Sequence, residues 1–326
     1  MNFYFGDKYN ELFDKYVEVV ECEISEEKFG LEEKIYNELQ NKIDIAIHSA
    51  ANVKHYGKYA NFKKDNVIAT QNIIDFCKKT NIQLHHISTM TVSGNYLIKQ
   101  DSDKNIFDEN SFYIGQNFED NVYSKSKLMA ESLVIQNINE GLCATIYRLG
   151  DLTGRYVDGA FQENINQNAT YLRLKSILEI GAIPENILEK QLEFSPVDYV
   201  AKAVTTIIWS NKSKNRIFNM YNPNMITTKE LLQFIEKINY SVKSISKETF
   251  ASLIESISSD KEKQSKLLGI INDFTENKDL VYNYTIEQNN KITNQYLKSL
   301  GFSWCPINEE YIDKLVEYMK KVKFID

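Results

Sequence analysis

The strongest chemical signal in this sequence is a tyrosine and a lysine four residues apart, Tyr123 and Lys127. Residues at positions i and i+4 share one face of a helix, so the phenol and the ammonium should lie side by side. A neighbouring positive charge lowers the pKa of a tyrosine from its ordinary value of about 10. We expect such a tyrosine to exchange a proton near neutral pH, although this spacing alone is more often an ordinary solvated helix face.

Two further stretches could contact a ligand. Residues 87–94 are rich in hydroxyl groups and follow a predicted strand, and the Thr89 hydroxyl could hydrogen-bond a carbonyl oxygen on which negative charge develops. The alternative is an ordinary Ser/Thr turn. Residues 48–51, His-Ser-Ala-Ala, follow another predicted strand, and their small side chains would let a ligand approach the backbone. The alternative there is tight packing of the turn.

The elements that would position these residues alternate between strands and helices. Apolar runs predict strands at residues 17–20, 43–47, 84–88 and 143–147, with helices at 31–40, 65–79 and 123–139. This order predicts an α/β fold, a Rossmann-like parallel sheet with helices on both faces. Ligands bind beyond the carboxyl ends of such strands, which is where the candidate residues fall.

The pattern changes after about residue 150. Helices are predicted at 198–209, 228–239, 247–258 and 311–321, with a short strand at 216–220. We therefore expect residues 1–155 to form the NAD(P)-binding domain. Residues 156–326 should form a smaller, mostly helical part that binds substrate and carrier and returns strands to the sheet.

Composition restricts the partners. The chain has 38 basic and 45 acidic residues and a net charge of −7, which argues against a nucleic-acid surface but not against an anionic cofactor. Its four cysteines form no CxxC or Cys/His cluster, so we expect no metal site, no disulfide framework and a reducing cytoplasm. No apolar run reaches the roughly 18 residues that span a bilayer, so no membrane association is expected. His85 and His86 should point to opposite faces of a strand, one into the core and one to the surface.

Five motifs in order resemble the extended short-chain dehydrogenase/reductase family. They are residues 48–51, 66–70, 89–94, 123–127 and 148–150. Three longer runs are similar to the terminal thioester reductase domains of nonribosomal peptide synthetases, and to the reductase domains of carboxylic acid reductases and fungal aminoadipate reductases. These runs are residues 53–57, 148–155 and 194–201.

The resemblance implies reduction of an acyl or peptidyl thioester, held on the phosphopantetheine arm of a carrier protein, to an aldehyde or further to an alcohol. NADPH is the implied cofactor, with NADH as the alternative. By the same resemblance Thr89 binds the carbonyl oxygen, Tyr123 protonates it, and Lys127 holds the nicotinamide ribose. The implied cofactor-binding residues are Ser49, Ala50, Ala51, Asn66, Lys127, Arg148, Leu149, Gly150, Asp151 and Leu152.

One family feature is absent from the sequence: the glycine-rich phosphate loop of the first βαβ unit. Residues 17–23 look like the family's third strand, so we expect a Rossmann-like sheet that lacks its first βαβ unit. The chain could be a fragment, a product of a wrong start or a natural truncation, and we favour the first two. The resemblance leaves open whether the isolated chain turns over. Two alternatives to a thioester reductase are a nucleotide-sugar epimerase or dehydratase of the same superfamily and a non-catalytic carrier-binding remnant.

Overall fold

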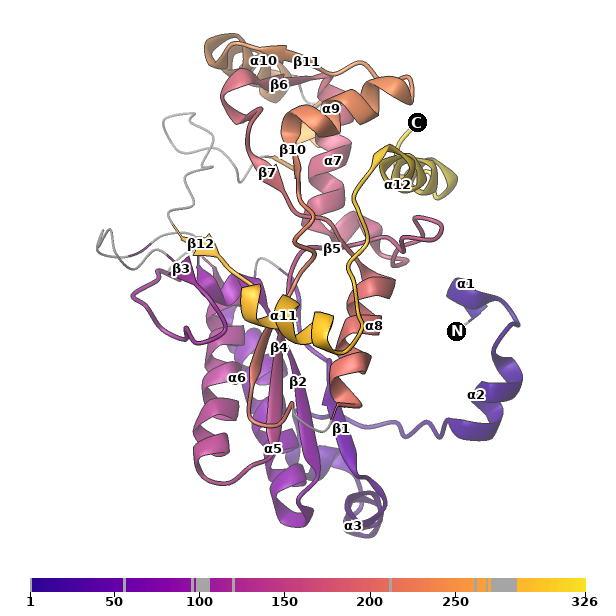
Figure 1. Cartoon of the computed structure of the whole chain (residues 1–326), viewed down its shortest axis with the longest axis vertical. Coiled ribbons are helices and arrows are strands. Elements are labelled where there is room, and N and C mark those ends of the chain that lie inside the picture. The colour runs from indigo at the N-terminus through magenta and orange to yellow at the C-terminus, as the bar shows by residue number, and fades with distance from the viewer. Residues whose placement is uncertain are drawn as a thin grey trace.

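The centre of the molecule is a parallel sheet of four strands in the order β1-β2-β4-β9 (Figure 1). This computed structural model describes residues 2–54, 57–94, 97, 106–118, 121–210, 213–260, 263–267, 269–270 and 286–326. The strands are β1 (Ile45–His48), β2 (Gln83–Thr89), β4 (Ala144–Leu149) and β9 (Ile217–Met220). All neighbouring pairs run parallel, as the alternation of strands and helices predicted.

Helices cover both faces of this sheet. On one face, α3 (Glu33–Lys42), α5 (Ala69–Thr80) and α6 (Val122–Asn139) pack against apolar side chains of β2 and β4. On the other, α8 (Val197–Ile208) and α11 (Lys291–Ser299) pack against β4 and β9. The predicted helix 65–79 begins earlier than expected, because α4 (Tyr59–Phe62) and a π-helical turn (Lys63–Ile68) lead directly into α5.

Because both faces are covered, the prediction for the adjacent histidines was wrong. His85 and His86 are only 0% and 1% exposed. The His85 ring lies 2.8 Å from the Tyr147 hydroxyl, on the face covered by α8. Neighbouring side chains in a strand point to opposite faces of the sheet. One of them is exposed to solvent only where a face of the sheet is not covered.

The predicted strand at residues 17–20 was also wrong. These residues are extended but pair with no strand in the described part of the chain, and Val17 and Val19 are 49% and 76% exposed. Among the described residues β1 pairs only with β2, and residues 17–20 join no ladder.

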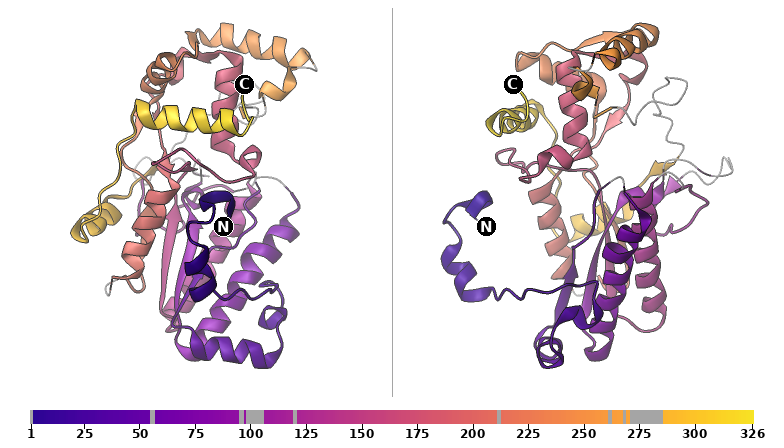
Figure 2. Two further views of the ribbon diagram at one scale, coloured as in Figure 1. Left: turned by 90° about the vertical axis from the view of Figure 1, so that its right-hand side faces the viewer. Right: turned by 180° about the vertical axis from the view of Figure 1, so that it is seen from behind.

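The N-terminal residues form an arm that stands away from the sheet (Figures 1 and 2). It contains α1 (Asn2–Phe5) and α2 (Asn10–Tyr16), and α2 has no buried residue. The arm touches the rest of the molecule at Arg155, whose guanidinium lies 5.4 Å from the centroid of the Phe5 ring.

The second part of the chain lies above the carboxyl edge of the sheet (Figure 1). Its core joins α7 (Ala169–Ile180), α9 (Thr228–Lys237) and α12 (Glu309–Lys321), and α10 (Lys247–Ser259) packs beside it. Four two-stranded ladders also lie at this end of the molecule, two of them with one strand from the first part: β5 (Leu152–Thr153) with β8 (Ser195–Pro196), β6 (Ala182–Pro184) with β11 (Lys243–Ile245), β7 (Gln191–Leu192) with β10 (Ile226–Thr227), and β3 (Ile106–Phe107) with β12 (Glu287–Gln288). The predicted helices of this part are confirmed, whereas α7 and α11 were not predicted.

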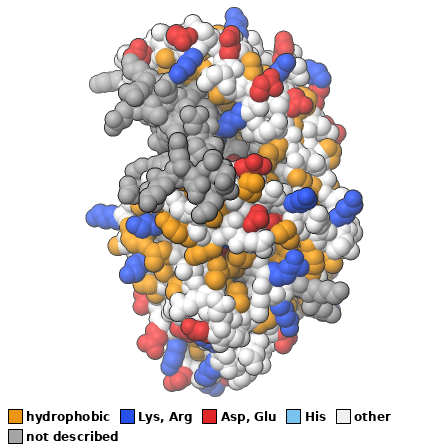
Figure 3. Space-filling view, turned by 60° about the vertical axis from the view of Figure 1, so that its left-hand side comes forward, with side chains coloured by type: hydrophobic (Ala, Val, Ile, Leu, Met, Phe, Trp, Pro, Cys, Tyr) orange, Lys and Arg blue, Asp and Glu red, His pale blue; other side chains and the backbone are white. Residues whose placement is uncertain are grey.

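Charge and hydrophobicity are mixed on the surface. On the face in Figure 3, Lys, Arg, Asp and Glu side chains are scattered, and hydrophobic side chains gather across the middle. Within the described residues, no helix combines the length and the hydrophobicity needed to cross a bilayer.

Candidate active site

The structure brings Thr89 and Tyr123 together at the carboxyl edge of the sheet. Thr89 is the last residue of β2, and Tyr123 lies in the first turn of α6, which Asn121 caps by accepting a hydrogen bond from the Ser124 amide at 2.9 Å. The hydroxyl groups of Thr89 and Tyr123 are hydrogen bonded to each other. The Thr89 hydroxyl also accepts from the Thr91 amide at 3.2 Å, which fixes its orientation.

The electrostatics of this pair differ from the expectation. Burial raises the pKa of Tyr123, and only the hydrogen bond with Thr89 opposes this. Lys127 is also buried, which lowers its pKa to about 8 against the opposing effect of Glu131, and its ammonium donates to the Ile87 carbonyl at 2.8 Å. The predicted lowering of the Tyr123 pKa was therefore wrong, because desolvation outweighs the hydrogen bond with Thr89 and Lys127 makes no contribution. Tyr123 is a neutral phenol, suited to donate a proton.

A buried ion pair joins helix α6 to the sheet, and the sequence analysis missed its acidic member. Glu131 lies four residues after Lys127, on the same face of α6. This repeated four-residue spacing could have identified Glu131 from the sequence. It accepts from the Ser88 hydroxyl at 2.8 Å and from Arg148 at 2.5 and 3.0 Å. Both side chains of the Arg148–Glu131 pair are 0% exposed.

The Arg148 side chain is fully buried and engaged inside the fold. Besides Glu131, its guanidinium donates to the carbonyls of Asp108 and Ser111 at 3.2 and 2.7 Å and lies 4.6 Å from the centroid of the Phe107 ring. These contacts engage the guanidinium on several sides. Arg148 therefore holds the segment around residues 107–111 against α6 and β4.

Asn66 stabilises the turn after β1 by hydrogen bonds. The side-chain oxygen of Asn66 accepts from the Asn52 amide at 2.7 Å, and its NH2 group donates to the Asn52 carbonyl at 3.1 Å and to Ser126 at 2.8 Å. Ser49 and Ala50 are exposed and Ala51 is half-buried, so this backbone is open to a ligand. Asn66 positions the turn relative to α6. Of the predicted motif 53–57, residues 55 and 56 lie outside the described residues.

The loop after β4 is fixed by a residue that no motif indicated, Glu193. The Asp151 amide donates to Glu193 at 2.9 Å, and the Ser195 hydroxyl donates to the same carboxylate oxygen at 2.6 Å. A Cβ on Gly150 would lie 2.1 Å from that oxygen, so only glycine fits. Burial, and next the Asp151 charge, raise the pKa of Glu193 to about 8, against the two hydrogen bonds.

The other residues of this loop connect β4 to β5. Leu149 ends β4 and Leu152 begins β5, and both are half-buried, while Asp151 is exposed. The Ser195 amide donates to the Asp151 carbonyl at 3.1 Å, so the loop is attached to β8 as well. Residues 149–152 therefore form a rigid rim beside the end of β2.

Comparison with known proteins identifies the family. The NAD-binding family described as "Male sterility protein" matches residues 3–204. The chain belongs to this family. It is homologous to the reductase domains of nonribosomal peptide and polyketide synthetases and to aminoadipate reductases.

Curated relatives match over most of this chain. A linear gramicidin synthase of Brevibacillus parabrevis is 23% identical over 92% of the chain, and the L-2-aminoadipate reductase of Eremothecium gossypii is 25% identical, in its large subunit, over 79%. These matches span only 6% and 19% of those proteins.

Among solved structures, a thiolation-reductase di-domain from an archaeal nonribosomal peptide synthetase is 28% identical with a TM-score of 0.87, over 100% of this chain and 66% of that one. The terminal reductase domain of the myxalamid pathway is 23% identical with a TM-score of 0.82, over 97% of this chain and 78% of that one. A UDP-glucuronic acid 4-epimerase from Bacillus cereus is 15% identical with a TM-score of 0.58, over 91% and 80%, and shares the fold.

Proposed function

We propose that this chain carries the catalytic residues of an NADPH-dependent reductase that converts a carrier-bound acyl or peptidyl thioester to an aldehyde, or further to an alcohol. The observation that carries the proposal is the hydrogen-bonded pair of Thr89 and Tyr123 at the carboxyl edge of the parallel sheet. Membership of a family of NAD-binding domains with reductase relatives supports it.

Each catalytic residue has a distinct role in this proposal. The hydroxyls of Thr89 and Tyr123 both donate to the thioester carbonyl oxygen, where negative charge grows as the carbon is reduced. Tyr123, held neutral by burial, then transfers its proton to that oxygen. The product is a hemithioacetal, whose C–S bond breaks to give the aldehyde and the carrier thiol. The bound nicotinamide supplies the hydride.

The described residues suit the nicotinamide half of the cofactor. The open turn at residues 49–51 and the rim at residues 149–152 lie at the carboxyl ends of β1 and β4. The buried Lys127 contacts the Ile87 carbonyl near the carboxyl end of β2. We propose that Lys127 binds the nicotinamide ribose and that both backbone segments line the cofactor. The sequence contains no glycine-rich loop, so no residue of this chain is assigned to the pyrophosphate or to a choice between NADPH and NADH.

The decisive experiment compares two proteins. One is the chain itself, and the other is the chain preceded by a strand–glycine loop–helix–strand unit. Oxidation of NADPH is measured with an acyl-pantetheine thioester and, separately, with nucleotide sugars. We expect thioester-dependent oxidation and an aldehyde product from the extended protein, and none from its Tyr123→Phe variant. Turnover of nucleotide sugars without thioester reduction would instead support the epimerase or dehydratase alternative.

The isolated chain also tests the non-catalytic alternative. A thermal shift with millimolar NADPH in the chain alone would show that residues 1–326 hold the nicotinamide end by themselves. If neither protein binds NADPH while the chain still binds a carrier protein, the chain is a carrier-binding remnant and the reductase proposal is wrong.

A further inference from the structure

Glu193 is a carboxyl group beside the candidate active site to which the proposed mechanism gives no role. It lies between β7 and β8 and contacts the rim at residues 149–152. Leu149 pairs with Thr89 across β4 and β2, and a Cβ on Gly150, the next residue, would lie 2.1 Å from the Glu193 Oε1 atom. Neighbouring strands are about 4.8 Å apart and successive Cα atoms about 3.8 Å apart, so the carboxyl lies within about 12 Å of the Thr89 Cα.

The two oxygens of this carboxyl have different surroundings. Oε1 accepts from the Asp151 amide at 2.9 Å and from the Ser195 hydroxyl at 2.6 Å. Ser195 is itself fixed, because its buried hydroxyl accepts from the Asn222 amide at 2.9 Å. Oε2 has no hydrogen-bond partner among the described residues, and Glu193 is half-buried. Oε2 is therefore the oxygen that is open to a ligand.

The Glu193 carboxyl carries a proton at neutral pH. Burial, and next the charge of Asp151, raise its pKa to about 8 against the two hydrogen bonds. Because both donors approach Oε1, the proton lies on Oε2. The group is an acid whose proton points away from the contacts that hold it.

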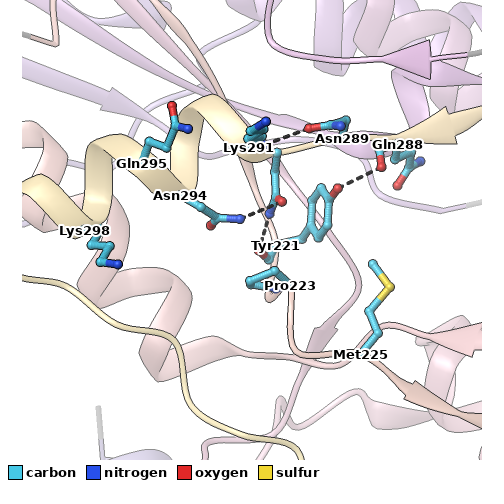
Figure 4. Close-up of a pocket in the computed structure, with 10 residues that line it drawn as sticks. Tyr221, Pro223, Met225, Gln288, Asn289, Lys291, Asn294, Gln295 and Lys298 are labelled. Carbon is cyan, nitrogen blue, oxygen red and sulfur yellow. Dashed lines mark hydrogen bonds between the residues drawn. The ribbon is translucent and has the colours of Figure 1, made fainter.

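Tyr221 lies beside this carboxyl, since a Cβ on Gly150 would also lie 2.5 Å from the Tyr221 Cβ. Its hydroxyl donates to the Gln288 carbonyl at 3.0 Å, as Figure 4 shows. Burial, and next the charge of Glu193, raise the pKa of Tyr221. A phenol that is already engaged and hard to ionise is a poor acid, which leaves Glu193 as the proton donor at this rim.

The proposed reduction needs an acid on the sulfur side of the substrate. Thr89 and Tyr123 act on the carbonyl oxygen, and Tyr123 is a phenolate once it has given up its proton. When the hemithioacetal breaks, sulfur leaves with the electron pair of the C–S bond, and an alkyl thiol leaves more readily if it is protonated as it departs. Sulfur and oxygen point in different directions from the carbon, so the groups at the oxygen do not reach the sulfur.

We propose that Glu193 is the general acid that protonates the departing carrier thiol, an inference that rests on the proposed function. The C–S bond breaks, its electron pair goes to sulfur, and sulfur takes the proton from Oε2. The Tyr123 phenolate removes the hydroxyl proton of the hemithioacetal, whose C–O bond becomes the aldehyde carbonyl. Glu193 is left as a carboxylate and regains its proton from water before the next turnover.

Leaving groups of different acidity test this role. In the extended protein, kcat is measured with an acyl-pantetheine thioester and with the thiophenyl ester of the same acyl group. An aryl thiol is more acidic than an alkyl thiol and leaves without help from an acid. Glu193→Gln keeps an oxygen for both hydrogen bonds but has no acidic proton. It should lower kcat for the alkyl thioester by about tenfold or more and leave kcat for the aryl ester nearly unchanged. Glu185→Gln, at an exposed carboxylate, should reduce both esters as the wild type does.

The pH dependence separates Glu193 from Lys127. Burial lowers the pKa of Lys127 to about 8, but any effect of its deprotonation applies to both esters. Loss of the Glu193 proton slows only the alkyl thioester, so in the wild type its kcat should fall more steeply above pH 8 than that of the aryl ester. In Glu193→Gln the two pH profiles should be parallel.

The chain as it stands tests the protonation without cofactor or substrate. The carboxyl ¹³C signal of Glu193, identified by its absence from Glu193→Gln, should titrate with a midpoint near pH 8. A midpoint near the ordinary value of 4.5 would overturn the inference.

Two kinetic results would also overturn it. Equal losses for the alkyl and aryl esters in Glu193→Gln would mean that Glu193 only shapes the rim, and no loss for either would mean that sulfur needs no acid. The failure of the proposed function looks different. If the wild-type extended protein reduces neither ester, the reductase chemistry is wrong, and this role of Glu193 is wrong with it.

Discussion

At the residue scale, the central feature is a half-buried neutral phenol hydrogen bonded to a threonine hydroxyl. Tyr123→Phe removes the proton donor but keeps the ring and its packing. In the protein extended by a glycine-loop unit, we expect kcat for thioester reduction to fall by about 10²–10⁴-fold, with the KM for NADPH nearly unchanged. Steady-state kinetics measure both, and a Tyr123→Phe variant with full kcat would exclude Tyr123 as the donor.

Glu193 gives a pH-dependent prediction at the same scale. Burial raises its pKa from 4.5 to about 8, so the folded protein keeps the proton over a range in which the unfolded chain loses it. The free energy of unfolding must therefore fall as pH rises from about 4.5 to about 8. Glu193→Gln keeps an oxygen that can accept from Asp151 and Ser195 but removes the titration. We expect the variant to be more stable than the wild type by about 2 kcal/mol at pH 8, a discounted value because the side chain is partly exposed.

Urea unfolding at several pH values measures this difference. At pH 4.5 and below, the wild type and Glu193→Gln should have nearly equal stability. Glu185→Gln, a change at an exposed carboxylate in the same part of the chain, should show no such growing difference. A constant difference between Glu193→Gln and the wild type at every pH would mean that Glu193 does not hold its proton.

At the element scale, α6 is held to the sheet by the Arg148–Glu131 pair. Arg148→Ala leaves the Glu131 carboxylate buried without its cation and frees the segment near Ser111. We expect the free energy of unfolding to fall by about 3–5 kcal/mol. Arg155→Ala is the control, because Arg155 pairs with Asp158 at a partly exposed site and its loss should cost about 1 kcal/mol or less. If chemical denaturation gives both variants the same loss in free energy of unfolding, the buried pair stabilises the fold no more than the exposed pair.

The same scale shows what the sequence could predict. Strands β2 and β4 and helix α6 follow from local apolar patterns, whereas the pairing of Thr89 with Tyr123 was implied by the family resemblance. The buried position of the Arg148 side chain depends on Glu131 and on backbone carbonyls distant in sequence, so no local pattern predicts it. The strand expected at residues 17–20 has the right local pattern, but a strand exists only where a neighbour supplies its hydrogen bonds. Glu193 was missed because its role comes from a loop that meets it only in the folded chain.

At the scale of the whole molecule, the central sheet has an open edge at β1 among the described residues. Among the described residues β1 pairs only with β2, and Ile47 on this edge strand is 55% exposed. Val17 and Val19, which precede α3 in the chain, are also exposed. An open, apolar strand edge is a template for pairing with another chain. We therefore expect the isolated chain to self-associate as its concentration rises.

A charge on that edge should prevent the association. Ile47→Lys places an ammonium where a second strand would dock and removes apolar surface, and because Ile47 is already more than half exposed, the fold should tolerate the change. Sedimentation velocity over a concentration series should show a concentration-dependent shift for the wild type and a constant monomer for Ile47→Lys. The matched control is Val157→Lys, at a residue that is 66% exposed and away from the sheet edge, which should associate as the wild type does. If Ile47→Lys and Val157→Lys behave alike, association does not use the β1 edge, and the edge is protected by other parts of the chain.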